Sequence, residues 1–301
     1  MRHRGGPSPA LVLVGSARDL VTGEDGDVNA VATAFVRAEV SRNQRLAEIA
    51  TTPHEPGATT LVGRIVGSGF RRAVARALPE HAERGTLLHL LLDDIPVTAL
   101  ISSYSLLYGG RRDAAPSGPR RRPSPDVCAG WRTGGSAMLA YSAGSRAPLE
   151  AGTVAQPLDD SSDPMAWHIM GILGSQEMRR CRRIDLVKGK DLSIDAMFRD
   201  TYIDNSGVER VLHQYSVTAR ADLATLAVTH IEAVPHTLPH VECADAAASA
   251  LAAREVHLPM LRNVVEQTLY GPVSCTHLND LLRSLADAGD LAALVPGPAA
   301  W

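Results

Sequence analysis

The sequence predicts an α+β fold made of two related halves, each with antiparallel strands followed by helices that pack on one face. Residues 19–53 and 185–235 both alternate apolar and polar side chains, which is typical of half-buried antiparallel strands. Each of these segments is followed by sequence with helical periodicity and then by a strongly apolar stretch. The repeated order of elements indicates an internal duplication, although two halves that converged on one layout would give the same pattern.

The domain boundaries follow from changes in composition. The first half is predicted to span residues 1–108 and the second half residues 163–301. Residues 109–126 are rich in Pro, Gly and Arg without periodicity, which predicts a mobile loop. Its basic run would suit a solvated linker or an acidic partner. Residues 127–162 are expected to form a hairpin with a Gly-Gly turn, followed by a connector.

The elements of the first half are predicted in chain order. Ala10–Val14 is expected to begin a buried strand, and E-D-G-D at 24–27 supplies a turn. Residues 61–78 have helical character. The apolar run G-T-L-L-H-L-L-L-D-D-I-P is interpreted as a strand that ends at Asp93 and Asp94. These two carboxylates would then be turn residues, with a metal-binding or catalytic role as the alternative.

The second half has the clearer helix signals. D-N-S-G at 204–207 predicts a turn, and residues 246–256 and 258–269 predict helices, the second with Pro259 near its start. The segment 274–285 is predicted to be a helix with Ser274 or Thr276 as its N-cap. Its buried face is predicted by apolar residues at i, i+3, i+4 and i+7, namely Leu278, Leu281, Leu282 and Leu285.

Composition limits the class of protein. The chain has 301 residues, of which 45% are hydrophobic and 21% charged, and a formal net charge of −3. This balance gives no reason to expect a nucleic acid or an anionic membrane as partner. No apolar run reaches the roughly 18 to 20 residues that would span a bilayer. A small-molecule substrate is the expected partner, and a homodimer is compatible with the sequence. Four cysteines without an export signal favour reduced thiols in the cytoplasm.

Two residues at the start of the predicted last helix could carry chemistry. Cys275 should face inward at the positive end of the helix, which would lower the pKa of an accessible thiol. His277 could pair with Asp280 three residues later, which would fix its tautomer. Cys275 would then be a nucleophile and His277 an acid or base. A capped helix with a buried thiol and a satisfied histidine is the structural alternative.

A second set of candidates lies on the predicted strands. In H-Q-Y-S-V, the period of two places His213 and Tyr215 on the packed face with Val217. Such a pair could bind a carbonyl oxygen and transfer a proton, or could simply form a hydrogen bond in the core. In F-R-D, Arg199 and Asp200 should face opposite sides of the strand, so only one of them would line a given pocket.

Cofactor motifs are weak or absent. A metal site would need Cys243, Cys275 and His277 to converge, but the spacing lacks the usual zinc patterns, so no metal is predicted. There is no G-x-G-x-x-G, Walker A or G-x-S-x-G motif in the required context. No cofactor is therefore expected.

The segments D-P-M-A-W-H, M-R-R-C-R-R-I-D, F-R-D, H-Q-Y-S-V, V-E-C-A-D-A-A and C-T-H-L-N-D together resemble a bacterial family of unknown function. The resemblance is clearest from Asp163 to the C-terminus, and L-L-D-D-I-P and C-A-G-W resemble its longer actinobacterial branch. It implies no reaction, cofactor or substrate. Met197 stands where the resemblance would lead us to expect histidine before F-R-D.

These patterns lead to one functional hypothesis and one rival. We expect a cofactor-independent enzyme that performs proton transfer on a small apolar or acyl-type substrate, as a lyase, hydratase, isomerase or cyclase would. Its expected setting is bacterial secondary or lipid metabolism. The rival is a non-catalytic ligand-binding or assembly protein. The candidate site residues are His213, Tyr215, Cys275, His277, Asp200 and Arg199, chosen because buried titratable groups cost free energy unless they are paired or used.

Overall fold

The computed structural model describes residues 2–3, 10–23, 25–108, 124–145, 152–159 and 161–295. The chain divides into two compact units. Unit 1 consists of Met1–Ala114, Asp160–Arg179 and Tyr202–Val208, and unit 2 of Ala115–Asp159, Arg180–Thr201 and Glu209–Trp301. Most of the predicted 109–126 loop lies outside the described residues.

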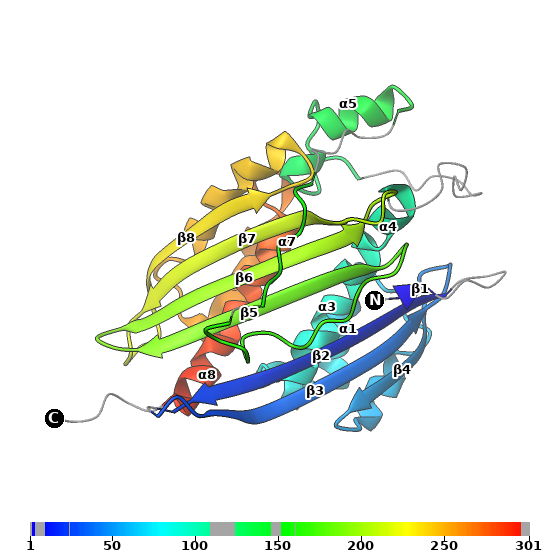
Figure 1. Ribbon diagram of the computed structural model, residues 1–301. Helices are drawn as coiled ribbons and strands as arrows, with labels where there is room; N and C mark the ends of the chain where they lie inside the picture. Colours follow the sequence, from blue (N-terminus) through cyan, green and yellow to red (C-terminus); the bar gives the residue numbers. More distant parts are fainter. Residues whose placement is uncertain are drawn as a thin grey trace. The chain divides into compact units, whose positions relative to one another are not determined.

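The first sheet is an antiparallel meander in the order β1-β2-β3-β4 (Figure 1). Its strands are β1 (Arg2–His3), β2 (Leu11–Thr22), β3 (Val28–Val40) and β4 (Leu46–Thr52). The start of β2 confirms the strand predicted at Ala10–Val14. The turn between β2 and β3 contains Gly26 at a φ of 85°, as the E-D-G-D signal predicted.

Helices follow this sheet, and the first of them is shorter than predicted. The helices are η1 (Pro56–Leu61), α1 (Phe70–Ala77), α2 (Pro79–Glu83), α3 (Leu87–Ile101) and α4 (Ser103–Tyr108). The helix predicted for 61–78 forms only from Phe70, because Gly63 and Gly69 adopt φ values of 84° and 83° that interrupt a right-handed helix.

The apolar run after Gly85 is a helix rather than the predicted strand. Thr86 caps α3 by accepting a hydrogen bond from the backbone N–H of His89 at 3.3 Å. A continuous apolar run has no period that separates a strand from a buried helix, and the 15-residue length with its cap gives a helix here. Asp93 is therefore inside a helix, where its carboxylate lies 3.3 Å from Arg71 Nε.

The second sheet has the order β5-β6-β7-β8 and consists of long strands joined by tight turns. The strands are β5 (Met178–Lys188), β6 (Leu192–Ile203), β7 (Glu209–Ala221) and β8 (Val228–Thr237). Neighbouring strands joined by such short connections run antiparallel. The predicted D-N-S-G turn is present, and the Asp204 side chain accepts hydrogen bonds from the backbone N–H groups of Ser206 and Val208.

Helices of unit 2 cover one face of this sheet (Figure 1). They are η3 (Val241–Ala253), η4 (Leu258–Met260), α6 (Leu261–Thr268), η5 (Gly271–Val273), α7 (Thr276–Ser284), η6 (Leu285–Asp287) and α8 (Ala288–Leu294). The predicted helices at 246–256, 258–269 and 274–285 correspond to parts of η3, η4–α6 and α7. The N-cap of α7 is Cys275, not Ser274 or Thr276, and its side chain makes no capping hydrogen bond.

The hairpin predicted after residue 126 is wrong. The chain instead forms η2 (Ala129–Trp131) and α5 (Ser136–Ser142). The Glu242 carboxylate accepts hydrogen bonds from Ser136 N at 2.6 Å and Ser136 Oγ at 2.9 Å. A carboxylate supplied by a distant segment therefore satisfies the start of α5, and local sequence carries no sign of it.

Each unit has its own hydrophobic core. In unit 2 the inward residues of the strands meet the leucine face of α7, as the helical spacing predicted. Leu278, Leu281, Leu282 and Leu285 are fully buried, and each contributes on the order of 2 kcal/mol to folding. Two antiparallel sheets, each followed by helices, confirm the α+β prediction and are compatible with a duplication.

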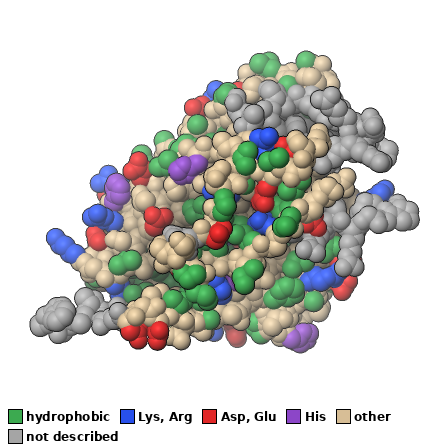
Figure 2. All heavy atoms as spheres, viewed as in Figure 1, with side chains coloured by type: hydrophobic (Ala, Val, Ile, Leu, Met, Phe, Trp, Pro, Cys, Tyr) green, Lys and Arg blue, Asp and Glu red, His purple; other side chains and the backbone are tan. Residues whose placement is uncertain are grey.

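One apolar segment corrects the expectation that no run is long enough to span a bilayer. Among the described residues, Leu87–Ser105 is long and apolar enough to cross a bilayer by length and composition alone. It includes α3, which packs on β2 and β3 through buried residues such as Leu88 and Leu92, as a core helix does. On the face in Figure 2, positive and negative side chains are interspersed among the described residues.

Candidate functional site

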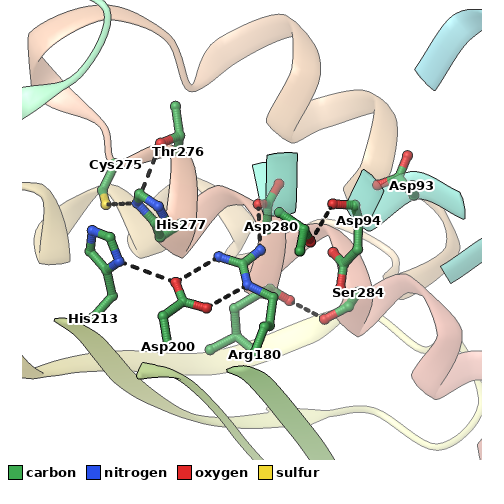
Figure 3. Close-up of polar contacts among 12 residues, drawn as sticks. Asp93, Asp94, Arg180, Asp200, His213, Cys275, Thr276, His277, Asp280 and Ser284 are labelled. Carbon is green, nitrogen blue, oxygen red and sulfur yellow. Dashed lines mark hydrogen bonds and ion pairs between the residues drawn. The ribbon is translucent and has the colours of Figure 1, made fainter. Parts of the chain in front are cut away.

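The site in unit 2 is built around a buried carboxylate on β6. Asp200 has 0% exposure, and Arg180 on β5 donates two hydrogen bonds to it (Figure 3). Arg180 Nε lies 2.7 Å from Oδ1 and Arg180 Nη2 lies 2.9 Å from Oδ2. Burial alone would raise the pKa of Asp200, but the guanidinium and its hydrogen bonds hold that pKa well below the usual range. Asp200 is therefore ionised at neutral pH.

The same arginine connects the sheet to α7. Arg180 Nη1 lies 3.3 Å from Oδ2 of Asp280, and the side chains of both residues are almost fully buried. Asp280, predicted to pair with His277, thus forms an ion pair with Arg180. A planar guanidinium has enough donors to bind two carboxylates at once.

His213 on β7 is oriented by this carboxylate. Its Nδ1 lies 3.1 Å from Asp200 Oδ2, and the residue is 2% exposed. Burial lowers the pKa of His213, while Asp200 acts in the opposite direction. Because burial is the larger effect, His213 is neutral at pH 7, with an Nδ1 proton directed at Asp200.

His277 on α7 completes the cluster by stacking on His213. The ring centroids are 3.7 Å apart and the planes differ by 22° (Figure 3). The ring of Phe198 on β6 lies beside the pair, with its centroid 6.3 Å from that of His277. Burial lowers the pKa of His277 well below 6.5, and the neighbouring His213 lowers it further. Both imidazoles are therefore uncharged at neutral pH.

One nitrogen of this pair has no hydrogen-bond partner among the residues that the structure describes. His277 Nδ1 lies 3.9 Å from Cys275 Sγ and 3.5 Å from Thr276 Oγ1. Its Nε2 atom is buried and makes no hydrogen bond to the described residues, although the residue as a whole is partly exposed. A buried nitrogen without a partner costs free energy in the folded state, so it marks a place where a ligand would gain affinity.

The thiol and the phenol candidates are both buried, the thiol beside His277 and the phenol ring against Phe198. Burial raises the pKa of Cys275 to about 11, despite backbone N–H groups that act in the opposite direction. A lowered pKa was expected only for an accessible thiol, and this thiol is buried, so Cys275 is a neutral thiol. Tyr215 is fully buried, its hydroxyl donates to the backbone carbonyl of Cys243 at 3.0 Å, and burial raises its pKa above the usual range.

The structure brings five of the six predicted site residues to one region and separates the sixth. Asp200, His213, Tyr215, Cys275 and His277 lie between the sheet and α7. Arg199 faces the other side of β6, as the strand period predicted, where it donates to Gln214 Oε1 at 2.9 Å and to the carbonyl oxygen of Gln156 at 2.7 Å.

Sequence reasoning missed Arg180. Met178 and Ile184 are apolar residues of the same parity on β5, and both are buried or packed against the core. That parity places Arg180 on the packed face of the strand. An arginine there needs a buried anion, so the run M-R-R-C-R-R contained a usable signal.

Three side chains of the site form a possible set of metal ligands. Asp200, His213 and His277 each offer a ligand atom, and these atoms all lie within 4.8 Å of one another. The convergence of Cys243 with Cys275 and His277 does not meet that distance among the described residues. Two imidazoles and a carboxylate are a suitable set for a transition-metal ion.

The fold and the site together define an α+β protein with a buried carboxylate–imidazole cluster. Residues 178–289, or 112 of the 301 residues, match a family model described as Protein of unknown function (DUF2889). The cluster lies entirely within this range. The match supports the predicted resemblance to an uncharacterised family, while the wider extent and the actinobacterial branch stay predictions. No curated protein and no solved structure matches the chain significantly.

Proposed function

We propose that this protein is an enzyme that catalyses proton transfer on a small apolar or acyl-type substrate without a cofactor. The observation that carries the proposal is the buried Nε2 of His277, which has no partner in the described structure and belongs to an imidazole stacked on His213. Lyases, hydratases, isomerases and cyclases all use such a step. Bacterial secondary or lipid metabolism is the proposed setting.

His277 is the proposed acid–base group. With its proton on Nδ1, near the Thr276 hydroxyl, the Nε2 lone pair can accept a proton from the substrate. A neutral imidazole is ready to act as a base at pH 7, and the lowered pKa keeps it in that form. The proton would then return to another atom of the substrate or of a water molecule.

His213 and Asp200 are the proposed positioning residues. Asp200 fixes the tautomer of His213 through the 3.1 Å hydrogen bond, and Arg180 holds the carboxylate from the other side. A fixed His213 ring in turn supports the stacked His277 ring. When His277 accepts a proton, the nearby carboxylate stabilises the positive charge.

An apolar or acyl-type substrate is consistent with the surroundings of the imidazoles. Phe198 lies beside His277, and the buried leucines of α7 lie on the same helix. Tyr215 and Cys275 are both neutral and buried, so they would act as hydrogen-bonding neighbours rather than as nucleophiles.

The rival function is a non-catalytic ligand-binding or assembly protein in which these groups complete a polar core. The bonds of Arg180 and of Tyr215 favour it, because both side chains have satisfied hydrogen bonds at buried positions. It would still use the unpartnered nitrogen of His277 to bind a ligand, but without turnover.

The test is hydrogen exchange from solvent into a panel of small ketones and acyl thioesters. The full chain is incubated with each compound in D₂O, and loss of the α-proton signal is followed by NMR. We expect His277→Gln to lower the exchange rate by about 10²- to 10⁴-fold while the melting temperature is kept. His230→Gln is the matched control, because His230 is exposed on β8 outside the cluster. A wild-type rate in His277→Gln would eliminate the proposed role.

A further inference from the structure

Asp200, His213 and His277 form a compact set of potential metal ligands. Their donor atoms lie within 4.8 Å of one another, and they come from β6, β7 and α7. Two imidazoles and one carboxylate bind divalent first-row transition ions, which accept nitrogen and oxygen ligands together. Placement on two strands and a helix gives a fixed framework for coordination.

The distance between Asp200 and His213 suits two neighbouring ligands on one ion. Ligand bonds to zinc of roughly 2.0 to 2.2 Å would place adjacent donor atoms about 3.0 to 3.5 Å apart. Asp200 Oδ2 and His213 Nδ1 are 3.1 Å apart. An ion there would replace the proton of that hydrogen bond, and His213 would carry its proton on Nε2 instead. The imidazole stays neutral, so the exchange needs no net loss of a proton.

Asp200 can serve as a ligand through the position that His213 now occupies. A carboxylate oxygen offers two lone-pair positions, and those of Oδ2 are used by Arg180 Nη2 and His213. An ion in place of the His213 proton would take the second position and leave both bonds to Arg180 intact. Arg180 is a nearby positive charge, but it is shared with Asp280. Two carboxylates around one guanidinium reduce the repulsion that a second cation would meet.

His277 would supply the third ligand after a small rotation. The two rings are nearly parallel, so their lone pairs do not converge on a single point in the described conformation. Rotation of the His277 ring would break no hydrogen bond at Nε2, which has none among the described residues. It would give up the long contacts of Nδ1 with Cys275 Sγ at 3.9 Å and Thr276 Oγ1 at 3.5 Å, which a bond to the ion would replace.

We propose that Asp200, His213 and His277 form a binding site for a divalent transition-metal ion such as Zn²⁺ or Co²⁺. This inference goes beyond the proposed function, which needs no metal. The ion occupies the lone pair of His277 that would accept a proton from the substrate. Metal binding and proton transfer therefore compete, and a bound ion inhibits the proposed reaction.

The experiment measures binding rather than turnover. The chelator-treated full chain is titrated with Co²⁺ and, separately, with Zn²⁺ by calorimetry, and the melting temperature is recorded with and without Zn²⁺. We expect one ion per chain, a higher melting temperature with Zn²⁺, and at least about 100-fold weaker binding in His277→Gln. The exposed His230→Gln variant should bind as the wild type does.

X-ray absorption at the zinc edge separates this site from the thiols and remains decisive if His277→Gln fails to fold. The proposed ligands give nitrogen and oxygen neighbours at about 2.0 to 2.2 Å, whereas cysteine ligands give sulfur at about 2.3 Å. Sulfur neighbours, absence of binding by the wild type, or unchanged affinity in a folded His277→Gln protein would each overturn the inference. None of these results would bear on proton exchange into substrates, which is measured without added metal.

Discussion

Removal of the Arg180 guanidinium tests the central electrostatic feature of the site. In Arg180→Met, the apolar side chain fills similar space but leaves the carboxylates of Asp200 and Asp280 without this partner. The Arg180 side chain is 6% exposed and that of Asp200 is 0% exposed, so solvent cannot replace the lost bonds. Breaking such a buried pair costs about 3 to 5 kcal/mol.

The expected loss of stability in Arg180→Met is large enough to measure in two ways. For a cooperative unit of 150 to 250 residues, about 3 to 5 kcal/mol corresponds to a decrease in melting temperature of roughly 6 to 20 °C. Urea unfolding followed by circular dichroism gives the free energy of unfolding at pH 7 directly. The difference in free energy of unfolding between wild type and Arg180→Met should be smaller at pH 5. A buried carboxyl group without its guanidinium has a raised pKa, so it binds a proton at pH 5 and no longer carries a buried charge.

Two further variants sharpen the result. Arg220 forms an exposed pair with Asp191 at 3.7 Å, and its side chain is 64% exposed. Arg220→Met should therefore change the free energy of unfolding by less than about 1 kcal/mol. Adding Asp200→Asn to Arg180→Met should recover part of the loss, because it removes the buried charge. Equal changes in the free energy of unfolding for Arg180→Met and Arg220→Met would refute the argument that the buried ion pair stabilises the fold.

Three other perturbations have defined outcomes. Tyr215→Phe leaves the Cys243 carbonyl without its donor and should cost about 1 to 3 kcal/mol in urea unfolding. Gly130→Ala should lower the melting temperature, because a Cβ there would lie 2.6 Å from Cys243 Sγ; an unchanged value would contradict the close packing. Burial keeps His213 and His277 neutral in the folded state, whereas unfolded histidine binds a proton near pH 6.5, so stability should fall from pH 7 to pH 6. His277→Gln should reduce that slope, by at most about 1.4 kcal/mol per pH unit, and an equal slope would count against a lowered pKa.

Strand period and helix spacing predicted much of the second half. The packed face of β7 was predicted from alternation alone, and it placed His213 and Tyr215 inside. The i, i+3, i+4, i+7 spacing of the leucines likewise predicted the buried face of α7. Such patterns predict burial because each strand or helix packs one face against a single core.

Other features depended on contacts between distant segments. The start of α5 is capped by Glu242, more than a hundred residues away, so no local pattern distinguishes it from a hairpin. The apolar run of α3 lacks a period, and only length and the Thr86 cap identify it as a helix. The stacking of His213 on His277 depends on how α7 packs against the sheet, which strand and helix patterns do not specify.

The bonds of Arg180 also bear on how the imidazoles can move. One guanidinium joins Asp200 of the sheet to Asp280 of α7, so sliding the helix along the strands would separate opposite charges in a medium of low polarity. A shift of α7 by even one residue would therefore be opposed by electrostatics as well as by packing. Rearrangement around a bound molecule is then confined to rotation of side chains such as His277, while the backbone framework keeps its position.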